Sequence, residues 1–306
     1  MNKANTCLVT GVAGFIGSHL AEQLTSEGYS VIGLDCFTNY YNKNIKLNNL
    51  TRLLERENFH FIEADILDID IESIINGNYL KTHTDSYWSP VSYVLHLAAQ
   101  AGVRSSWGTT FETYTSNNIL ATQRILEASK GSDIKMFVNA SSSSVYGNTV
   151  DLPTSEDTKP HPISPYGVSK LAAENLCQLY WENYKLPVLS LRYFTVYGPR
   201  QRPDMGFHKF ITAIQTGNEI TLFGDGEQTR DCTYVGDVVD GTISAMTSSA
   251  TGKVFNIGAA APISVNKIIS EIEQILNLNA NIRKIETQKG DVENTWANIN
   301  LSKKIL

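Results

Sequence analysis

Residues 6–20 read TCLVTGVAGFIGSHL. The first five predict a buried strand, and from Phe15 apolar residues recur every three or four positions, as in a helix. Between these two elements lie Gly11, Gly14 and Gly17, at G-x-x-G-x-x-G spacing. A strand that turns through glycines directly into a helix presents the free N–H groups of the helix N-terminus, which bind phosphate. The stretch therefore predicts the first turn of a dinucleotide-binding fold.

The same alternation of strand and helix continues through the first half of the chain. Four further apolar runs read as buried strands: SVIGLD (30–35), FHFIEA (59–64), VSYVLHLAA (91–99) and KMFVNAS (135–141). Helical periodicity covers 15–28 and 113–131. Continuous rather than alternating apolar strands are typical of a sheet covered on both faces. We therefore expect an α/β fold with a doubly wound parallel sheet. The polar, aperiodic stretch 76–90 is predicted to be a surface insertion.

The character of the sequence changes after Gly147, where Pro, Gly and short elements become frequent. This composition is typical of a loop-rich part that supplies a ligand site. We expect a cofactor-binding domain over 1–170, to which some later segments return. A smaller α/β domain over 171–306 is expected to bind the substrate.

Bulk properties exclude several classes of function. The 306-residue chain has a net charge of −6, so there is no electrostatic case for nucleic acid or an anionic membrane. The N-terminal sequence lacks the apolar run of a signal peptide, and no stretch approaches the length of a membrane span. Four cysteines without close pairing favour a reducing cytoplasm. The six histidines show no metal-ligand spacing, so no metal is expected.

Asp35 ends the second predicted strand. An acidic residue at this position accepts hydrogen bonds from the adenosine ribose hydroxyls and repels a 2′-phosphate. Its simpler interpretation is a cap at a strand end. Together with the glycines, Asp35 favours NAD over NADP.

A second constellation lies in SPYGVSK, residues 164–170. Ser164 can cap a helix that begins at Pro165, which places Tyr166 and Lys170 at i and i+4 on one face. An ammonium beside a phenol favours the phenolate and lowers the tyrosine pKa from about 10. Tyr166 would then be a general acid and base. The alternative is an ordinary amphipathic helix.

The run SSSSVYG (141–147) directly follows the predicted strand at 135–141. Serine runs are usually solvated linkers. At the end of a core strand, four hydroxyls instead suggest a site that donates hydrogen bonds to a ligand.

In this order and spacing, the motifs resemble the extended short-chain dehydrogenase/reductase superfamily, the NAD-dependent sugar-nucleotide epimerases and dehydratases. The resemblance covers essentially the whole chain, including HLAAQAGVRSS, LRYFTVYGPRQRPDM and FGDGEQTRDCTYVGDVV. It implies that Ser144 hydrogen-bonds the sugar 4-oxygen and that Tyr166 moves the 4-hydroxyl proton. Lys170 would hold the nicotinamide ribose and lower the tyrosine pKa. The implied NAD-binding residues are Gly11, Gly14, Phe15, Ile16, Gly17, Asp35, Asp65, Ile66, Leu97, Ala98, Ala99, Tyr166 and Lys170.

The serines also discriminate within the family. In the 4,6-dehydratases an Asp-Glu pair precedes V-Y-G, where this chain has Ser143 and Ser144. The UDP-glucuronate decarboxylases usually carry Glu at the position of Ser144. Both activities are therefore disfavoured. Ser142, Ser143 and Thr195 are candidates to surround a C6 carboxylate, a pattern most similar to the bacterial UDP-glucuronate 4-epimerases. The alternative is that small hydroxyls pack here for steric reasons, because hexose epimerases also have a serine-rich stretch.

The resemblance thus implies NAD-dependent 4-epimerisation of a UDP-sugar, UDP-glucuronate to UDP-galacturonate. Alternatives are a UDP-glucose/UDP-galactose or N-acetylhexosamine 4-epimerase, a carbonyl reductase that releases its cofactor, and a catalytically silent NAD-binding regulator. It also implies a homodimer through 115–130 and 164–184, and a C-terminus that lacks the last one or two elements. Arg230 is the preferred phosphate ligand and Asp291 a uridine-ribose contact. The candidate substrate-binding residues are Arg104, Ser142, Ser143, Ser144, Thr195, Arg202, Phe207, Phe210, Arg230 and Asp291.

Overall fold

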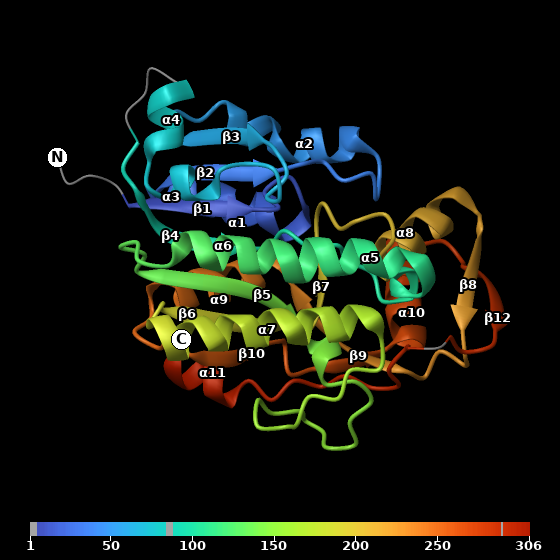
Figure 1. Cartoon of the computed structure of the whole chain (residues 1–306). Coiled ribbons are helices and arrows are strands. Elements are labelled where there is room, and N and C mark those ends of the chain that lie inside the picture. The colour runs from blue at the N-terminus through green and yellow to red at the C-terminus, as the bar shows by residue number, and fades with distance from the viewer. Residues whose placement is uncertain (1–4, 84–87, 289) are drawn as a thin grey trace.

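The computed structural model describes residues 5–83, 88–288 and 290–306. Its centre is a seven-stranded parallel sheet with the order β10-β6-β5-β4-β1-β2-β3 (Figure 1). The first five strands in the chain follow the predicted runs closely. The strands are β1 (Thr6–Thr10), β2 (Ser30–Asp35), β3 (Phe59–Glu63), β4 (Val91–His96), β5 (Met136–Ser142), β6 (Val188–Tyr193) and β10 (Lys253–Ile257).

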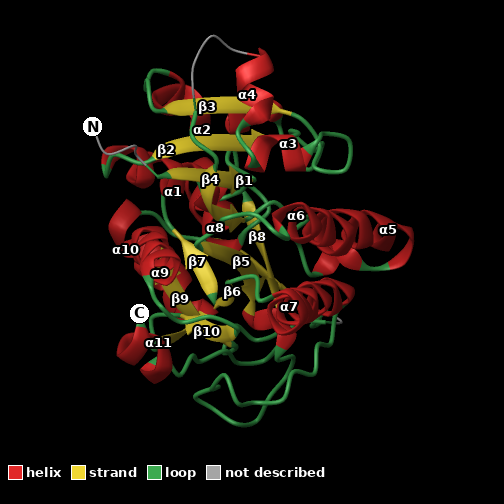
Figure 2. Cartoon of the chain, turned by 60° about the vertical axis from the view of Figure 1, so that its left-hand side comes forward, coloured by secondary structure: helices red, strands yellow, loops and turns green. Residues whose placement is uncertain are grey.

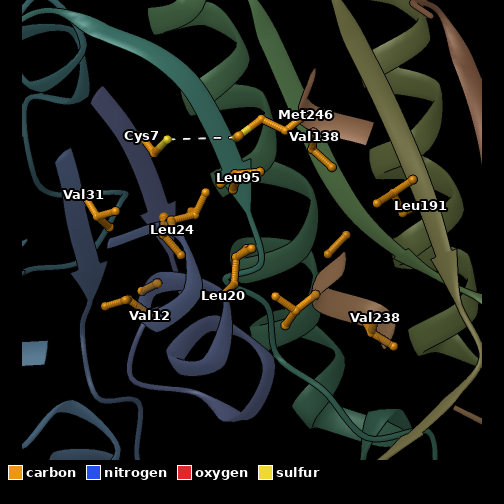
Figure 3. Packing of buried hydrophobic residues seen from close by; sticks show 14 of the residues in the cluster. Cys7, Val12, Leu20, Leu24, Val31, Leu95, Val138, Leu191, Val238 and Met246 are labelled. Carbon is orange, nitrogen blue, oxygen red and sulfur yellow. Dashed lines mark hydrogen bonds between the residues drawn. The ribbon is translucent and has the colours of Figure 1, made fainter. Parts of the chain in front are cut away.

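Helices cover both faces of this sheet (Figure 2), which confirms the doubly wound fold. Alternate residues of β1 contribute to two separate apolar clusters, Cys7 and Val9 to one and Leu8 to the other. Figure 3 shows the first cluster, where the Cys7 thiol donates to the Met246 sulfur at 4.0 Å. Helices α1 (Phe15–Ser26), α2 (Lys43–Leu54) and α9 (Val235–Thr247) pack on that face, and α3 (Ile71–Ile75), α6 (Ala121–Ser129) and α7 (Pro165–Tyr184) on the other.

The helix predicted over 113–131 is interrupted. It comprises the short α5 (Phe111–Tyr114), a π-helical stretch at Thr115–Leu120, and α6. In this stretch Asn118 is buried, and its side-chain amide bonds both backbone groups of Gln100, at 2.7 and 3.0 Å. Such π-helical stretches are frequent at functional sites. This one fastens the segment that follows β4.

The prediction that 76–90 is a surface insertion is partly wrong. Residues Asn78–His83 form helix α4, and the side chains of Leu80 and Trp88 are buried in the second cluster. Residues 84–87 lie outside the described part of the chain. Two apolar anchors, rather than helical periodicity, therefore fix α4 on the sheet.

A smaller part of the molecule is built from residues after 170. It contains the sheet β11-β9-β7 and the pair β12-β8, seen beside α8 and α10 in Figure 1. Because β6 and β10 belong to the large sheet, later segments do return to it. The functional boundary at residue 170 stays a prediction. The elements are β7 (Thr195–Tyr197), α8 (Gly206–Thr216), β8 (Glu219–Phe223), β9 (Thr229–Tyr234), β11 (Pro262–Ser264), α10 (Val265–Leu276), β12 (Asn281–Ile285) and α11 (Asn300–Ile305).

A buried ion pair joins α7 to β6. Arg192 donates to both carboxylate oxygens of Glu174, at 2.9 and 2.8 Å, and the two side chains are 5% and 4% exposed. Ser141 on β5 donates to the same carboxylate at 2.5 Å. The first serine of the run is thus part of the core. Within the described residues, no helix is long and apolar enough to cross a lipid bilayer.

Candidate active site

One open cleft, with an empty volume of about 1210 Å³, runs along the carboxyl ends of the central strands. Ligands of doubly wound sheets bind at this edge. All thirteen residues predicted to bind the cofactor line the cleft. Their assignment to NAD remains a prediction, but the structure gathers them at a single site.

The glycine-rich turn has the close packing that its spacing predicts. Gly11 has φ +70°, and a Cβ there would lie 2.8 Å from the backbone nitrogen of Ala98. A Cβ at Gly17 would lie 2.2 Å from the Gly11 carbonyl oxygen. Larger residues would therefore push β1, α1 and the segment after β4 apart. The turn keeps its backbone open at the N-terminus of α1, as a bound pyrophosphate requires.

Asp35 is held in place by backbone donors at the adenosine end of the cleft. Its two carboxylate oxygens accept from the N–H groups of Ala13 at 3.1 Å and Phe37 at 2.8 Å. Burial raises the pKa of Asp35, and these hydrogen bonds and the charge of Lys46 oppose that rise. Lys46 is only 4% exposed and donates to the Thr38 carbonyl at 2.8 Å. The sequence pattern did not reveal this buried cation beside the carboxylate.

Tyr166 and Lys170 lie on the first turns of α7, as predicted. The Ser164 hydroxyl caps this helix by accepting from the Gly167 N–H at 3.1 Å. The buried Lys170 ammonium donates to the Ala140 carbonyl at 2.9 Å. Burial lowers the pKa of Lys170 to about 8, although the nearby Glu174 carboxylate opposes the shift. The helix thus brings a phenol and an ammonium to one wall of the cleft.

The surroundings of Tyr166 differ from our expectation. Burial raises its pKa, and the groups that lower it are the Ser142 hydroxyl, by hydrogen bonding, and the Arg202 charge. The Tyr114 ring packs edge-on against the Tyr166 ring, with ring centroids 6.2 Å apart. Because Lys170 instead bonds the Ala140 carbonyl, the prediction that it lowers the tyrosine pKa is not confirmed.

We predicted that Ser144 bonds the sugar 4-oxygen, but the serine hydroxyl that lowers the pKa of Tyr166 is that of Ser142. Ser144 contacts Ser142 through two hydrogen bonds. The Ser142 Oγ donates to the Ser144 Oγ at 3.1 Å, and the Ser144 N–H donates to the Ser142 Oγ at 3.2 Å. The cause is local, because β5 ends at Ser142 and a 3₁₀ turn over Ser143–Val145 redirects the following side chains. In the sheet, Ser142 lies opposite Tyr193, two residues before Thr195. None of the hydroxyl residues Ser142, Ser143, Ser144 and Thr195 lines the cleft, so their contact with a substrate stays a prediction.

Arg202 is the predicted substrate anchor that lines the cleft. Its guanidinium binds Asp204 through two hydrogen bonds of 2.9 and 3.0 Å. Burial alone would lower the pKa of Arg202, but the bond to Asp204 and its charge raise it overall. Arg202 stays a cation at every physiological pH.

The other predicted anchors are engaged with protein groups; Arg104 belongs to the segment after β4, and the rest come from residues after 170. Arg104 pairs with Asp291 at 2.7 Å and lies 3.9 Å from the Phe223 ring centroid. Arg230 on β9 donates to the carbonyls of Thr229 and Glu293, at 2.8 and 3.1 Å. Phe207 on α8 stacks on Tyr197 with ring centroids 5.0 Å apart, and Phe210 packs in the same apolar cluster. Their contact with substrate stays a prediction.

Several residues that line the cleft were not predicted. They come from the loop after β2, from the first turn of α2, from the segment after β4 and from the π-helical stretch. The signal that could have found them is their position after the carboxyl ends of parallel strands. They include Cys36, Thr38, Tyr40, Tyr41, Lys46, Gln100 and Asn117.

The fold and this cleft define a dinucleotide-binding α/β protein, and sequence comparison identifies its family. Residues 7–258 match the NAD dependent epimerase/dehydratase family, and the chain belongs to that family. This confirms the resemblance inferred from the motifs.

Individual relatives cover nearly the whole chain. A UDP-glucuronate 4-epimerase of Thermodesulfobacterium geofontis (strain OPF15) is 40% identical over 98% of this chain and 89% of its own length. An uncharacterized UDP-glucose epimerase of Bacillus subtilis (strain 168) is 44% identical over 98% and 91%. The crystal structure of UDP-glucuronic acid 4-epimerase from Bacillus cereus, in complex with UDP-glucuronic acid and NAD, superposes with a TM-score of 0.91 at 41% identity, covering 98% and 92%.

Proposed function

We propose that the protein is an NAD-dependent isomerase that interconverts UDP-glucuronate and UDP-galacturonate by inverting C4 of the sugar. The observation that carries the proposal is the gathering of Tyr166, Lys170, Asp35 and the glycine-rich turn around one cleft. A structural relative with 41% identity holds both UDP-glucuronic acid and NAD, which supports the choice of substrate and cofactor.

The residues of the cleft fit NAD along its length. A Cβ at Gly14 would lie 3.1 Å from the Gly11 carbonyl, so glycine keeps space for a pyrophosphate. Asp35 offers carboxylate oxygens to the adenosine ribose, and Lys170 lies at the opposite end beside Tyr166. When bound, NAD would accept a hydride from C4 of the sugar and later return it to the opposite face.

Tyr166 would remove the proton of the 4-hydroxyl as C4 is oxidised and give it back when C4 is reduced. Ser142, whose hydroxyl lowers the pKa of Tyr166, replaces Ser144 as our candidate to hold the 4-oxygen. The cation of Arg202 favours the phenolate through space, so a substrate anchor and the proton carrier are electrostatically connected.

A carboxylate at C6 imposes a further requirement. Once C4 is a ketone, the C6 carboxylate lies β to it, and such β-keto acids lose CO₂ when the breaking bond aligns with the carbonyl. Hydroxyls that bond the carboxylate can hold it out of that alignment. Ser143, Ser144 and Thr195 are our candidates for this role.

The first experiment compares two substrates. The purified protein is incubated with UDP-glucuronate and, separately, UDP-glucose, and NMR follows the sugar products. We expect UDP-galacturonate with little UDP-pentose. Turnover of UDP-glucose alone would instead support a hexose epimerase, the alternative favoured by the Bacillus subtilis relative.

Substitution of single serines tests the revised role of Ser142. We expect Ser142→Ala to lower kcat by about 10²-fold, because it removes a donor at the reacting oxygen. Ser144→Ala is expected to have a smaller effect, and one confined to UDP-glucuronate if the hydroxyl contacts the carboxylate. Steady-state kinetics with each variant provide the measurement. A larger loss for Ser144→Ala would restore the original assignment.

We also propose a cytoplasmic homodimer. Its four cysteines are free thiols, which suits a reducing compartment. Helices α6 and α7 lie side by side across one face (Figure 1). On and beside the outer surface of these helices, the side chains of Leu120, Val168 and Leu179 are 45% to 50% exposed. Sedimentation velocity at micromolar concentration tests the dimer.

A further inference from the structure

Tyr40 lies at a point where three loops around the cleft meet. It belongs to the loop after β2, on the cofactor side, and its hydroxyl donates to Asp204 at 3.1 Å. Asp204 belongs to the loop 198–205 on the substrate side, where it holds Arg202 through two hydrogen bonds. A single phenol therefore connects the two sides of the cleft.

The third loop is the segment after β4. The Ser105 hydroxyl lowers the pKa of Tyr40, and the hydroxyl oxygens of Ser105 and Tyr40 both lie 2.5 Å from the position that a Cβ on Gly102 would occupy. Ser105 lies 2.8 Å from the hydroxyl of Tyr114, whose ring packs edge-on against Tyr166. A chain of polar contacts thus leads from Asp204 through Tyr40 to the wall that carries the general base.

The loop 198–205 is also fixed at a second point. Arg200 adopts φ +65°, a left-handed conformation that is unfavourable for a residue with a Cβ. Its guanidinium donates to Glu22 at 2.7 Å and Ser18 at 3.2 Å on α1, the helix that follows the glycine-rich turn. The loop is therefore fastened to α1, the helix at the pyrophosphate end of the cleft. The Arg200–Glu22 ion pair offsets the unfavourable backbone conformation of Arg200.

We propose that Tyr40 is a positioning residue: it ties the three loops over the cleft, fixes Arg202 through Asp204, and retains the bound cofactor. The claim that Tyr40 retains the cofactor does not depend on the proposed function. Only the expected change in KM for UDP-glucuronate rests on the proposed function. An epimerase must return the hydride that it removed, so a cofactor that left midway would end the cycle. The Tyr40–Asp204 hydrogen bond is part-buried and its acceptor is a charged carboxylate, so it is stronger than the exposed polar contacts of a loop.

The test measures release of the reduced cofactor. Protein loaded with NADH by exchange is mixed with excess NAD, and the loss of NADH fluorescence gives the dissociation rate. We expect Tyr40→Phe to release NADH about tenfold faster, the effect of losing one hydrogen bond to a charged group. The matched control is Tyr184→Phe, an exposed tyrosine at the end of α7, which should release NADH at the wild-type rate. No sugar is present, so the result does not depend on which sugar the enzyme uses.

Further variants separate positioning from a general structural effect. With UDP-glucuronate, Tyr40→Phe should raise KM severalfold and change kcat by less than about twofold, because Tyr166 is untouched. Ser105→Ala, which cuts the other contact of Tyr40, should speed NADH release in the same direction. Adding Tyr40→Phe to Asp204→Ala should produce little further acceleration, because Asp204→Ala has already removed the acceptor of the Tyr40 hydroxyl. Wild-type release rates in both Tyr40→Phe and Ser105→Ala would overturn the proposal.

Discussion

Tyr166→Phe is expected to lower the epimerisation rate by about 10³-fold, because it removes the group that carries the 4-hydroxyl proton in both directions. The protein should still fold, since the ring and its edge-on contact with Tyr114 remain. The measurement is kcat at saturating substrate, together with absorbance at 340 nm after addition of UDP-glucuronate. The variant should show no reduction of its bound cofactor.

Two controls make this result specific. The NAD content of the variant, measured after denaturation, should equal that of the wild type, and its thermal midpoint should be unchanged. Tyr184→Phe should keep full activity. Retention of more than about a tenth of the wild-type kcat by Tyr166→Phe would contradict the role of Tyr166 as sole proton carrier.

Arg192→Leu is expected to lower the free energy of unfolding by about 3–5 kcal/mol, because it leaves the Glu174 carboxylate buried without its cation. The pair is only 5% and 4% exposed, so water cannot replace the lost partner. Urea unfolding, followed by intrinsic fluorescence, measures the change. The effect should reach the active site as well, since Ser141, adjacent to Ser142, donates to the same carboxylate.

The double variant Glu174→Leu, Arg192→Leu distinguishes an unpaired charge from lost packing. Replacing both partners by apolar residues removes the buried charge, so it should recover much of the stability lost in the single variant. A double variant less stable than Arg192→Leu alone would mean that the ion pair itself, rather than its breakage, determines stability here.

The features predicted correctly from the sequence are those that depend only on residues close together in the chain. The first five strands are continuous apolar runs, and the glycine-rich turn needs three residues without a Cβ at given spacing; both are properties of short segments. Lys170 and Tyr166 are on one helix face because Ser164 and Pro165 define where α7 begins. The cofactor-binding residues predicted from these segments all line the cleft, whereas Ser142 at the end of β5 does not.

The parts that were missed or misassigned depend on contacts between distant segments. Whether Ser142 or Ser144 meets Tyr166 depends on the 3₁₀ turn after β5, which no periodicity reveals. Tyr40 and Lys46 enter the cleft because the loop after β2 folds back over it. Lys170 was expected to act on the phenol, but the Ala140 carbonyl binds its ammonium. Helix α4 is fixed by burial of Leu80 and Trp88 rather than by its own pattern.

The strand order of the large sheet has a consequence for how such enzymes can be recombined. The chain leaves the sheet after β6, builds the smaller part, and returns as β10. A chimera with one crossover at residue 170 would join the strands β5-β4-β1-β2-β3 of one parent to the strands β6 and β10 and a ligand site from another. Mismatched side chains along the β5–β6 junction would then face each other in the core. We expect substrate range in this architecture to change by substitutions in loops, or by paired crossovers on both sides of the smaller part, rather than by exchange of a terminal domain.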